Sequence, residues 1–366
     1  MRAQDIPQPI MDLLRKGTCL PAYPLVLNED RTLDTERQKA VTRYYLDAGA
    51  GGMAVGVHTT QFAIRDVGLY EPVLRIAAET TRDWTDVPKL MIAGVTGQTA
   101  QAVAEAQTAR GLGYHAVLLN LARLKGASEE DILAHCRTVA ADMPVIGFAL
   151  LPEVGGFHLS YDFWRAFAQI DNVIAIKMAP FDRYRTLEIV RAVYDADRAD
   201  EVTLYTGNDD HIVLDLLQPF VVRSADGTSE HRARIRGGLL GHWSVWVQKS
   251  AQLLDQIHAL PDGADVPEDL LAMDSIVTDC NLAIYDALND LKGCIPGCLE
   301  VLKRQGLVER TLCLDKNERM SEGQAAQIDR VYSMYPEMND DAFVSANIDR
   351  WISGDKTRQL VTDERI

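Results

Sequence analysis

Asn172-Val173-Ile174-Ala175-Ile176-Lys177-Met178 is a run of β-branched and aliphatic residues that contains one lysine. The run follows Asp171 and is ended by Pro180, and its length predicts a strand buried on both faces, as in a parallel sheet. Burying an ammonium group without a partner is unfavourable, so a lysine in such a strand either pairs with an acid or loses its proton. We therefore expect Lys177 to be a buried ion-pair partner or a neutral amine that acts as a nucleophile.

Short apolar runs alternate with amphipathic segments on both sides of this strand. Eight such units within about 250 residues favour a closed (β/α)8 TIM barrel, because strands that alternate with helices give right-handed crossovers and a parallel sheet. An open doubly wound sheet is the alternative, but its G-x-G-x-x-G fingerprint is absent. Strands are predicted over residues 18–27, 51–57, 90–94, 116–120, 144–150, 173–178, 203–206 and 238–243, and helices over 34–48, 68–81, 99–110, 128–140, 161–169, 183–194 and 209–217.

Three regions differ from this repeat. Residues 1–17 are expected to form an N-terminal extension to the barrel of residues 18–260. Within the barrel, residues 220–235 predict two short strands around the Asp-Gly turn Ala225-Asp226-Gly227-Thr228, a hairpin insertion with a role in contacts or stability. Residues 261–366 are expected to be a helical C-terminal region, with a polar tail after Asn339, that packs outside the barrel or at a subunit contact.

The composition excludes several classes of function. The chain has 366 residues, 47% hydrophobic and 25% charged, as in an ordinary soluble globular protein. Its net charge of −16 argues against binding to nucleic acid or to an anionic membrane, because Lys and Arg drive both. The first residues carry charges and prolines where a signal peptide needs an apolar core, and no stretch approaches the ~20 apolar residues of a membrane span. We therefore expect a cytoplasmic protein whose six scattered cysteines are reduced.

The strand of residues 172–178, here called the lysine strand, resembles the corresponding strand of the dihydrodipicolinate synthase and N-acetylneuraminate lyase family. Members of that family are Schiff-base enzymes on a (β/α)8 barrel. The resemblance covers residues 18–308 and implies that Lys177 attacks the ketone of pyruvate or another 2-oxo acid. The imine then acts as an electron sink while a carbon–carbon bond is made or broken. Such an amine must be neutral near pH 7, so burial has to lower its pKa. Four further segments match the family in order: residues 92–97 (third-strand glycine turn), 207–210 (Gly-Asp-Asp turn), 237–244 (glycine-rich eighth strand) and 291–307 (C-terminal helices with a proline and Leu-Lys-Arg).

The resemblance also implies where the substrate binds. Thr59 and Thr60 stand where the family's adjacent threonines hold the substrate carboxylate, and hydroxyls with turn amides can bind an anion without a full charge. The alternative is that these threonines are only polar loop residues. Gly207, in the turn after the seventh strand, is expected in the substrate site by the same resemblance.

The chain departs from the family at the groups that move protons. Phe148 stands where the fifth strand normally ends in a proton-shuttling tyrosine, and phenylalanine can neither donate nor accept a proton. The family's second relay tyrosine is also missing, because this chain has Asn-Leu-Ala-Arg at residues 120–123. The arginine of the synthase branch is missing as well, because this chain has Leu-Pro-Glu-Val at residues 151–154. His58, Gln61 and Phe62 also replace the family's residues around the threonines. We therefore do not expect a true dihydrodipicolinate synthase.

Two histidines are candidates for the missing proton carrier. His58 and His242 lie near the predicted C-terminal ends of strands, which form the catalytic face of such barrels, and histidine titrates near neutral pH. The alternative for each is a hydrogen-bonded pocket or core histidine. Tyr205, at the end of the seventh strand, is a further candidate donor, although core packing is favoured for it.

Other polar and aromatic residues near these strand ends are assigned plainer roles. Asp209 and Asp210 are expected to cap the following helix, which would contain a structural His211. Trp243 is expected to form an aromatic wall for a bulkier substrate. No two of these histidines have the i, i+4 spacing of a zinc motif, so we expect neither a metal nor a cofactor.

Together these features predict a lyase or aldolase that forms a Schiff base between Lys177 and a 2-oxo acid or related carbonyl compound, with aldol cleavage, condensation or dehydration. The alternative is a barrel that has lost catalysis and binds a small carbonyl or carboxylate ligand. The missing tyrosines favour that alternative, while Lys177 and the two threonines oppose it. The resemblance further implies a homo-oligomer, a dimer or a tetramer, with contacts near the barrel mouth.

Overall fold

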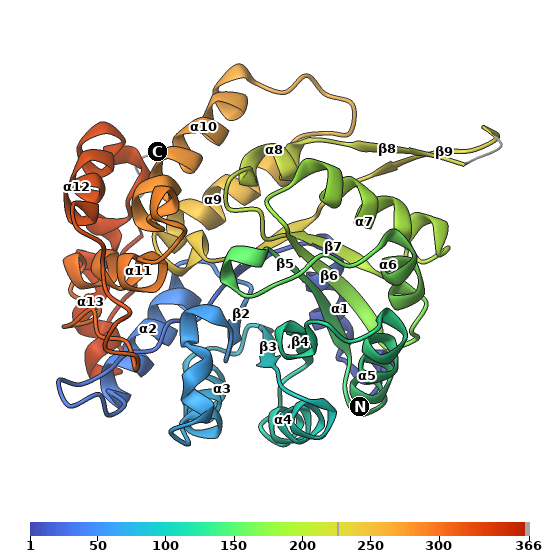
Figure 1. Cartoon of the computed structure of the whole chain (residues 1–366). Helices are drawn as coiled ribbons and strands as arrows, with labels where there is room; N and C mark the ends of the chain where they lie inside the picture. The colour runs from blue at the N-terminus through green and yellow to red at the C-terminus, as the bar shows by residue number, and fades with distance from the viewer. Residues whose placement is uncertain (225–226, 363–366) are drawn as a thin grey trace.

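Eight parallel strands form the centre of the protein in the computed structural model, which describes residues 1–224 and 227–362 (Figure 1). Their order is β1-β10-β7-β6-β5-β4-β3-β2. Tyr23 N donates to Ala54 O over 2.9 Å, which joins the first strand to the second and nearly closes the sheet. The predicted TIM barrel is confirmed. The strands are β1 (Cys19–Pro21), β2 (Gly52–Val55), β3 (Leu90–Val95), β4 (Ala116–Leu119), β5 (Val145–Leu150), β6 (Val173–Ala179), β7 (Thr203–Thr206) and β10 (Gly237–Leu240).

Helices surround the barrel between successive strands (Figure 1). Polar caps fix where several of them begin: the side chains of Asp34, Ser128, Ser160 and Asp182 accept hydrogen bonds from first-turn amides. Within residues 1–224 and 227–362, no helix combines the length and the apolar character needed to cross a membrane. These helices are α2 (Thr35–Asp47), α3 (Tyr70–Trp84), α4 (Thr99–Gly111), α5 (Glu129–Asp142), α6 (Tyr161–Ala168), α7 (Arg183–Asp195), α8 (Ile212–Leu217) and α9 (Val247–His258).

Three predicted strands were too long, and one of them, predicted over residues 51–57, is limited to Gly52–Val55. Residues 18–27 contain only the short β1, because Pro21 and Pro24 lack the amide hydrogen that a strand ladder needs. The strand predicted over residues 238–243 ends at Leu240, and His242–Ser244 form a 3-10 turn instead.

Helix α1 (Gln8–Lys16) lies at the N-terminal end of the barrel. Its Ile10 and Leu14 belong to the same apolar cluster as interior strand residues such as Ile92 and Ile146. The Tyr205 hydroxyl donates to the carbonyl of Leu14 over 2.9 Å. The first residues therefore complete the interior of the barrel at the end opposite the strand C-termini.

A two-stranded hairpin projects from the barrel at the predicted insertion (Figure 1). It consists of β8 (Phe220–Arg223) and β9 (Glu230–Ala233), which pair antiparallel. The His231 ring contacts that of Tyr194 in α7, with centroids 5.4 Å apart. Residues 225–226 of the predicted Asp-Gly turn lie outside the described residues.

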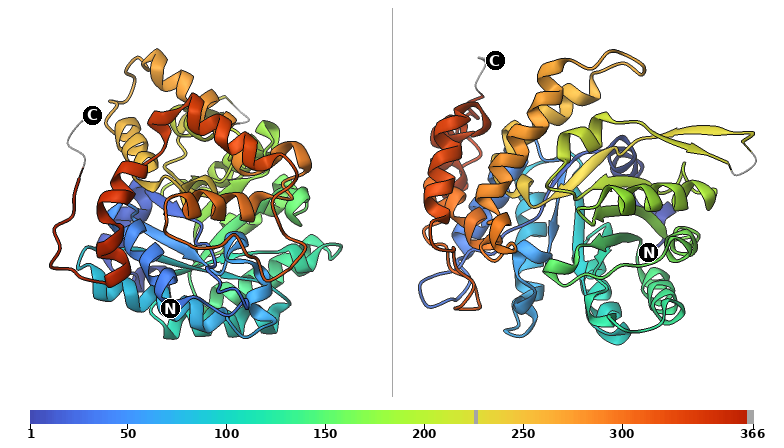
Figure 2. Two further views of the ribbon diagram at one scale, coloured as in Figure 1. Left: turned by 90° about the vertical axis from the view of Figure 1, so that its left-hand side faces the viewer. Right: turned by 45° about the horizontal axis from the view of Figure 1, so that its top comes forward.

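Four C-terminal helices form a layer beside the barrel, drawn in orange and red in Figure 2. They are α10 (Glu268–Ile284), α11 (Cys294–Arg304), α12 (Gln324–Met334) and α13 (Asp341–Ser353). Arg330 of α12 makes two 2.7 Å contacts with the carboxylate of Asp279, which ties α12 to α10. The predicted helical region outside the barrel is thus present.

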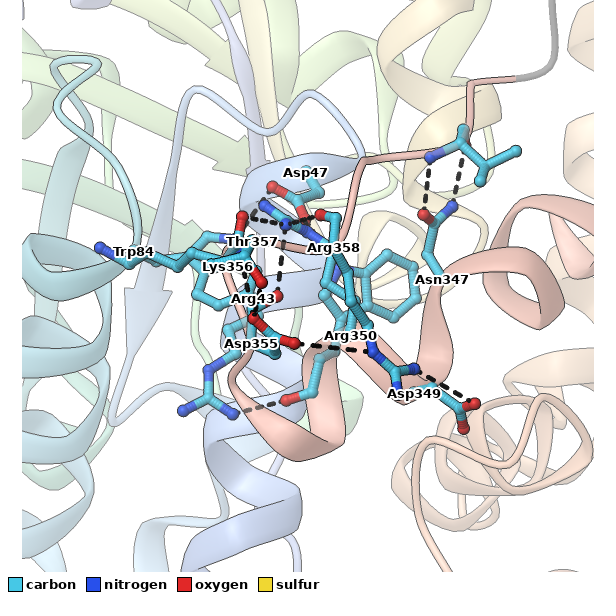
Figure 3. Close-up of polar contacts among 12 residues, drawn as sticks. Arg43, Asp47, Trp84, Asn347, Asp349, Arg350, Asp355, Lys356, Thr357 and Arg358 are labelled. Atoms are coloured by element: carbon cyan, nitrogen blue, oxygen red, sulfur yellow. Dashed lines mark hydrogen bonds and ion pairs between the residues drawn. The ribbon is translucent and has the colours of Figure 1, made fainter.

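The prediction of a polar tail after Asn339 was wrong for α13. Phe343, Val344, Asn347 and Trp351 recur at helical spacing, and all four are buried. The carboxylate of Asp47 in α2 accepts the indole N–H of Trp351 over 2.8 Å, and its other oxygen accepts the indole N–H of Trp84. The same carboxylate lies 3.2 Å from Arg350 Nε (Figure 3). Helix α13 is therefore a packed part of the fold.

Candidate active site

A cavity of about 70 Å³ lies where the barrel strands end. Residues at the C-terminal ends of β1, β2, β5, β6, β7 and β10 line it, and the C-terminal helical layer covers it with Tyr285, Leu291 and Cys294. This end of a TIM barrel is where active sites are built. The other lining residues are Ala22, Val57, His58, Thr59, Phe148, Leu150, Leu151, Val154, Lys177, Ala179, Phe181, Gly207, Asp209 and Gly241.

Lys177 points from β6 into this cavity. It pairs in register with Phe148 of β5, and its Nζ lies 4.4 Å from the centroid of the Phe148 ring. Only 8% of Lys177 is exposed, and burial lowers its pKa from 10.5 to about 8, although the negative charge of Asp209 acts in the opposite direction. A substantial fraction of the amine is therefore neutral near physiological pH.

Gly207 makes room for the lysine side chain. A Cβ atom at this position would lie 2.6 Å from Lys177 Cε and 2.9 Å from Ala179 Cβ. Any side chain here would therefore displace the lysine. The resemblance placed Gly207 in the substrate site, and the structure places it beside Lys177.

Asp209 is the acidic group of the cavity, and its predicted role as a helix cap was wrong. Helix α8 begins at Ile212, and the residue that precedes it is His211. The Asp209 carboxylate instead accepts the backbone N–H of His242 over 3.0 Å and the hydroxyl of Tyr285 over 3.1 Å. Burial raises the pKa of Asp209 to about 7, while the positive charge of Lys177 acts in the opposite direction. The cavity thus holds an amine and a carboxyl group that both titrate near neutral pH.

Tyr285, at the C-terminal end of α10, is a cavity residue that no sequence motif indicated. Asn281, one turn earlier in α10, donates from Nδ2 to the carbonyl of Asp209 over 2.7 Å. A Cβ atom on Gly241 would lie 2.6 Å from the Tyr285 hydroxyl oxygen. The glycine after β10 therefore provides the space in which the hydroxyl reaches Asp209.

The two threonines lie in the turn His58–Thr60 after β2, but they differ in position. Both hydroxyls donate to the carbonyl of Tyr23, over 3.1 Å from Thr59 and 2.5 Å from Thr60. The Thr60 hydroxyl also accepts the N–H of Gly56, and Thr60 does not line the cavity. Thr60 therefore holds the turn together, and Thr59 is the member of the pair that lines the cavity.

The structure separates the two candidate histidines. His58 lines the cavity, and its ring is within hydrogen-bonding reach of the Cys294 thiol. His242 is buried behind it: its Nδ1 lies 2.7 Å from Asn281 Oδ1, and burial lowers its pKa to about 4. His242 and Trp243 line a different, apolar cavity between the barrel and the helical layer. Neither His242 as a proton carrier nor Trp243 as a substrate wall fits this placement, because both side chains point away from Lys177's cavity.

Two other predicted residues have structural contacts. The Tyr205 hydroxyl is directed to Leu14 at the opposite end of the barrel, which confirms core packing. His211 Nδ1 lies 3.2 Å from the carboxylate of Asp274 in α10, so it helps to attach the helical layer.

A larger cavity of about 570 Å³ opens outside the first and shares Asp209 and Tyr285 with it. Its lining includes five carboxylate residues, and the described residues that line it include neither lysine nor arginine. A negatively charged entrance of this kind favours hydroxyl or amino groups over a second carboxylate. The five acidic residues are Glu153, Asp182, Asp209, Asp210 and Asp290.

Comparison with known proteins identifies the family. The model of the Dihydrodipicolinate synthetase family matches residues 17–228, more than half of the chain, and the chain belongs to this family. N-acetylneuraminate lyase 2 of Escherichia coli O6:H1 is 26% identical over 195 residues, which cover 52% of this chain and 60% of that protein. A 5-dehydro-4-deoxyglucarate dehydratase of Pseudomonas putida is 30% identical over 136 residues, 36% of this chain and 42% of that protein. The chain thus spans less than two thirds of the length of these relatives.

Solved structures share the fold over nearly their whole length. Dihydrodipicolinate synthase from Oceanobacillus iheyensis superposes with a TM-score of 0.68 at 16% identity and covers 90% of this chain and 99% of its own. A prophage protein of the dihydrodipicolinic acid synthase family from E. coli K12, in complex with pyruvate, gives a TM-score of 0.68 at 17% identity, with 86% and 97% covered. The resemblance predicted from the lysine strand is therefore confirmed at the level of family and fold.

Proposed function

We propose that the protein is a Schiff-base lyase in which Lys177 forms an imine with a 2-oxo acid or a related carbonyl compound. One observation carries this proposal: a buried lysine, with its pKa lowered by burial, lies in a cavity at the catalytic end of the barrel. Membership of a family whose relatives are named as lyases and dehydratases supports it.

The chemistry follows from a neutral amine beside a bound carbonyl carbon. Nitrogen attacks the carbon, the carbonyl oxygen leaves as water, and the iminium that remains draws electrons from the neighbouring carbon. That electron demand permits loss of a proton, cleavage or formation of a carbon–carbon bond, or elimination of a hydroxyl group. Aldol cleavage, condensation and dehydration are thus outcomes of one intermediate.

The charges around the cavities support a substrate with hydroxyl groups rather than a second carboxylate. Lys177 and His58 are the basic residues in the lining of the inner cavity. The outer cavity adds His158 and four acidic residues, which are Glu153, Asp182, Asp210 and Asp290. An arginine that would bind a second carboxylate is absent from both described linings, so we propose that dihydrodipicolinate synthesis is not the reaction. The name of the lyase relative denotes a polyhydroxy acid with one carboxylate, which agrees with this substrate class, whereas the glucarate of the dehydratase relative is a dicarboxylate.

Borohydride trapping tests the imine directly. The protein is treated with borohydride and a panel of 2-oxo acids, including pyruvate and sugar acids, and the intact mass is measured. We expect one adduct that disappears in Lys177→Ala. Lys89→Met is the matched control, because burial also lowers the pKa of Lys89 and its Nζ donates to Ala50 O away from this cavity. No adduct with any compound, or an adduct that persists in Lys177→Ala, would overturn the proposal.

A second candidate function is a barrel that binds a carbonyl or carboxylate ligand without turnover. Phe148 favours it, because the ring beside Lys177 has no proton to transfer. Trapping of an adduct without any change in the ligand's covalent structure during prolonged incubation would support this candidate over the lyase.

We also propose a homo-oligomer, either a dimer or a tetramer, in the cytoplasm, as the family resemblance implies. Sedimentation velocity over a range of protein concentrations measures the oligomeric state, and a monomer at every concentration would contradict it.

A further inference from the structure

We propose that Tyr285 and Asp209 form the proton-transfer pair that serves Lys177, with the tyrosine supplied by the C-terminal helical layer instead of by β5. The inference rests on the proposed imine chemistry and adds the groups that move its protons. Asp209 lies within the part of the chain that the family model matches, residues 17–228, and Tyr285 lies outside it.

The pair has a fixed geometry inside the cavity. Tyr285 is 3% exposed, and its hydroxyl donates to Asp209 Oδ1 over 3.1 Å. The Asn281 side chain donates to the backbone carbonyl of Asp209, and the backbone N–H of His242 donates to its carboxylate. Gly241 leaves the space that the hydroxyl occupies. Tyr285 and Asp209 both line the cavity that contains Lys177, so a bound carbonyl compound would meet the lysine and the pair together.

The contacts of Tyr205, His242 and Thr59 exclude them as proton carriers, whereas His58 lines the cavity and is named below among the groups around the pair. The Tyr205 hydroxyl is bound to Leu14 at the far end of the barrel, and the His242 ring lies behind Asn281 in another cavity. The Thr59 hydroxyl already donates its proton to Tyr23 O. Phe148 has no proton to give.

The charged and titratable groups around the pair come from several elements. Lys177 faces it from β6, Asp210 is adjacent in the chain, His58 lies on the turn after β2, and Cys294 lies on α11. Hydrogen bonding with Cys298, together with burial, raises the pKa of the Cys294 thiol well above its usual range, so it stays protonated. Asp209 therefore has both a proton-carrying neighbour, Tyr285, and an ammonium partner, Lys177.

The proposed steps conserve protons and electrons. The Lys177 ammonium gives a proton to the Asp209 carboxylate, and the neutral amine attacks the carbonyl carbon. One nitrogen proton then moves to the former carbonyl oxygen, which gives the neutral carbinolamine. Asp209 returns the stored proton through Tyr285 to the carbinolamine hydroxyl, which leaves as water and produces the iminium. A proton on the substrate next to the iminium then passes to the Tyr285 oxygen while the tyrosine proton passes to Asp209. The C–H electrons form the enamine, and the reverse transfer restores the iminium.

Hydrogen exchange in a trapped 2-oxo acid tests these transfers without knowledge of the natural substrate. Each compound that forms an adduct is incubated with the protein in D₂O, and loss of the hydrogens next to the carbonyl is followed by proton NMR. We expect Tyr285→Phe and Asp209→Asn to exchange on the order of 100-fold more slowly than the wild type, the lower end of the contribution of a positioned acid–base group. Tyr114→Phe is the control, because this buried tyrosine donates to Leu74 O outside the cavity, and its rate should equal that of the wild type.

Two further readouts separate proton transfer from a merely structural role. The wild-type exchange rate, divided by the amount of adduct formed at each pH, should rise with pH as Asp209 ionises, and this limb should disappear in Asp209→Asn. Gly241→Ala should reproduce the loss in Tyr285→Phe, because its Cβ would occupy the position of the tyrosine hydroxyl. It serves as the second variant if Tyr285→Phe fails to fold, which the melting temperature of each variant will reveal.

The outcomes distinguish this inference from the proposed function. If the wild type forms an adduct but does not exchange hydrogens, or if Tyr285→Phe and Gly241→Ala exchange at the wild-type rate, the pair is not the proton carrier and the imine proposal stands. If the wild type forms no adduct with any compound, the proposed function fails, and the role of the pair fails with it.

Discussion

The amine nitrogen of Lys177 lies 4.4 Å from the centre of the Phe148 ring, on two adjacent strands in direct register. An aromatic face attracts a cation, whereas burial disfavours one, and the lowered pKa of Lys177 shows that burial dominates. This contact sets the nucleophile beside an aromatic ring that takes no part in proton transfer.

Phe148→Tyr should increase the rate of hydrogen exchange in a trapped 2-oxo acid by roughly 10-fold, because it adds a proton-carrying hydroxyl next to the lysine. Adduct formation itself should remain intact. Phe181→Tyr, which adds a hydroxyl to the same cavity from a residue after β6, is the control and should give no increase. An unchanged rate in Phe148→Tyr would mean that the existing proton path is not limiting.

The rate of adduct formation should rise with pH and level off above about 8, because only the neutral amine of Lys177 attacks. Asp209→Asn should move the midpoint to lower pH, because the negative charge of Asp209 raises the pKa of Lys177. Initial trapping rates at a series of pH values measure both effects. Asp210→Asn should leave the midpoint in place, and a midpoint that moves upward in Asp209→Asn would contradict the assigned charge interaction.

Gly207→Ala should abolish adduct formation while the protein remains folded. The added methyl group would lie 2.6 Å from Lys177 Cε, so the lysine must leave its place in the cavity. Gly111→Ala is the matched control in helix α4, where a Cβ meets nothing within 4 Å, and it should be neutral or slightly stabilising. Intact mass after trapping and thermal unfolding of both variants provide the comparison, and a normal adduct in Gly207→Ala would show that the lysine is placed differently.

Asp47→Ala should lower the free energy of unfolding by about 3 kcal/mol, because it leaves Arg350 and the indole N–H groups of Trp84 and Trp351 without their acceptor. Urea denaturation measures this change. Asp349→Ala is the control. It removes an exposed carboxylate of α13 that lies 3.4 Å from Arg358, and it should be nearly neutral. Equal effects of the two substitutions would show that α13 is not anchored through Asp47.

The barrel was predictable because its signal is repeated. Each parallel strand is a short apolar run followed by an amphipathic helix, and strand order alone brings the ends of β2, β5, β6 and β7 to one face. The family resemblance assigned Thr59 and Gly207 to the substrate site, and this topology explains why they share one cavity with Phe148 and Lys177.

The rest of the site depends on packing that no local pattern encodes. Asp209 in Gly-Asn-Asp-Asp has the sequence of a helix cap, and only the approach of α10 turns it into a buried acid. Tyr285 lies more than a hundred residues after Lys177, in a helix whose docking position cannot be inferred from its own sequence. His242 was misassigned because the eighth strand ends earlier than predicted, and its ring then packs behind Asn281.

The ribosome makes all eight strands, and the lysine among them, before it makes α10. Domains tend to fold in the order in which they are synthesised, so the barrel can form while the helical layer is still unmade. Until α10 has been made and has packed on the barrel, Tyr285 does not cover the cavity that contains Lys177. The surroundings that enclose this lysine are therefore complete only after α10 has been synthesised.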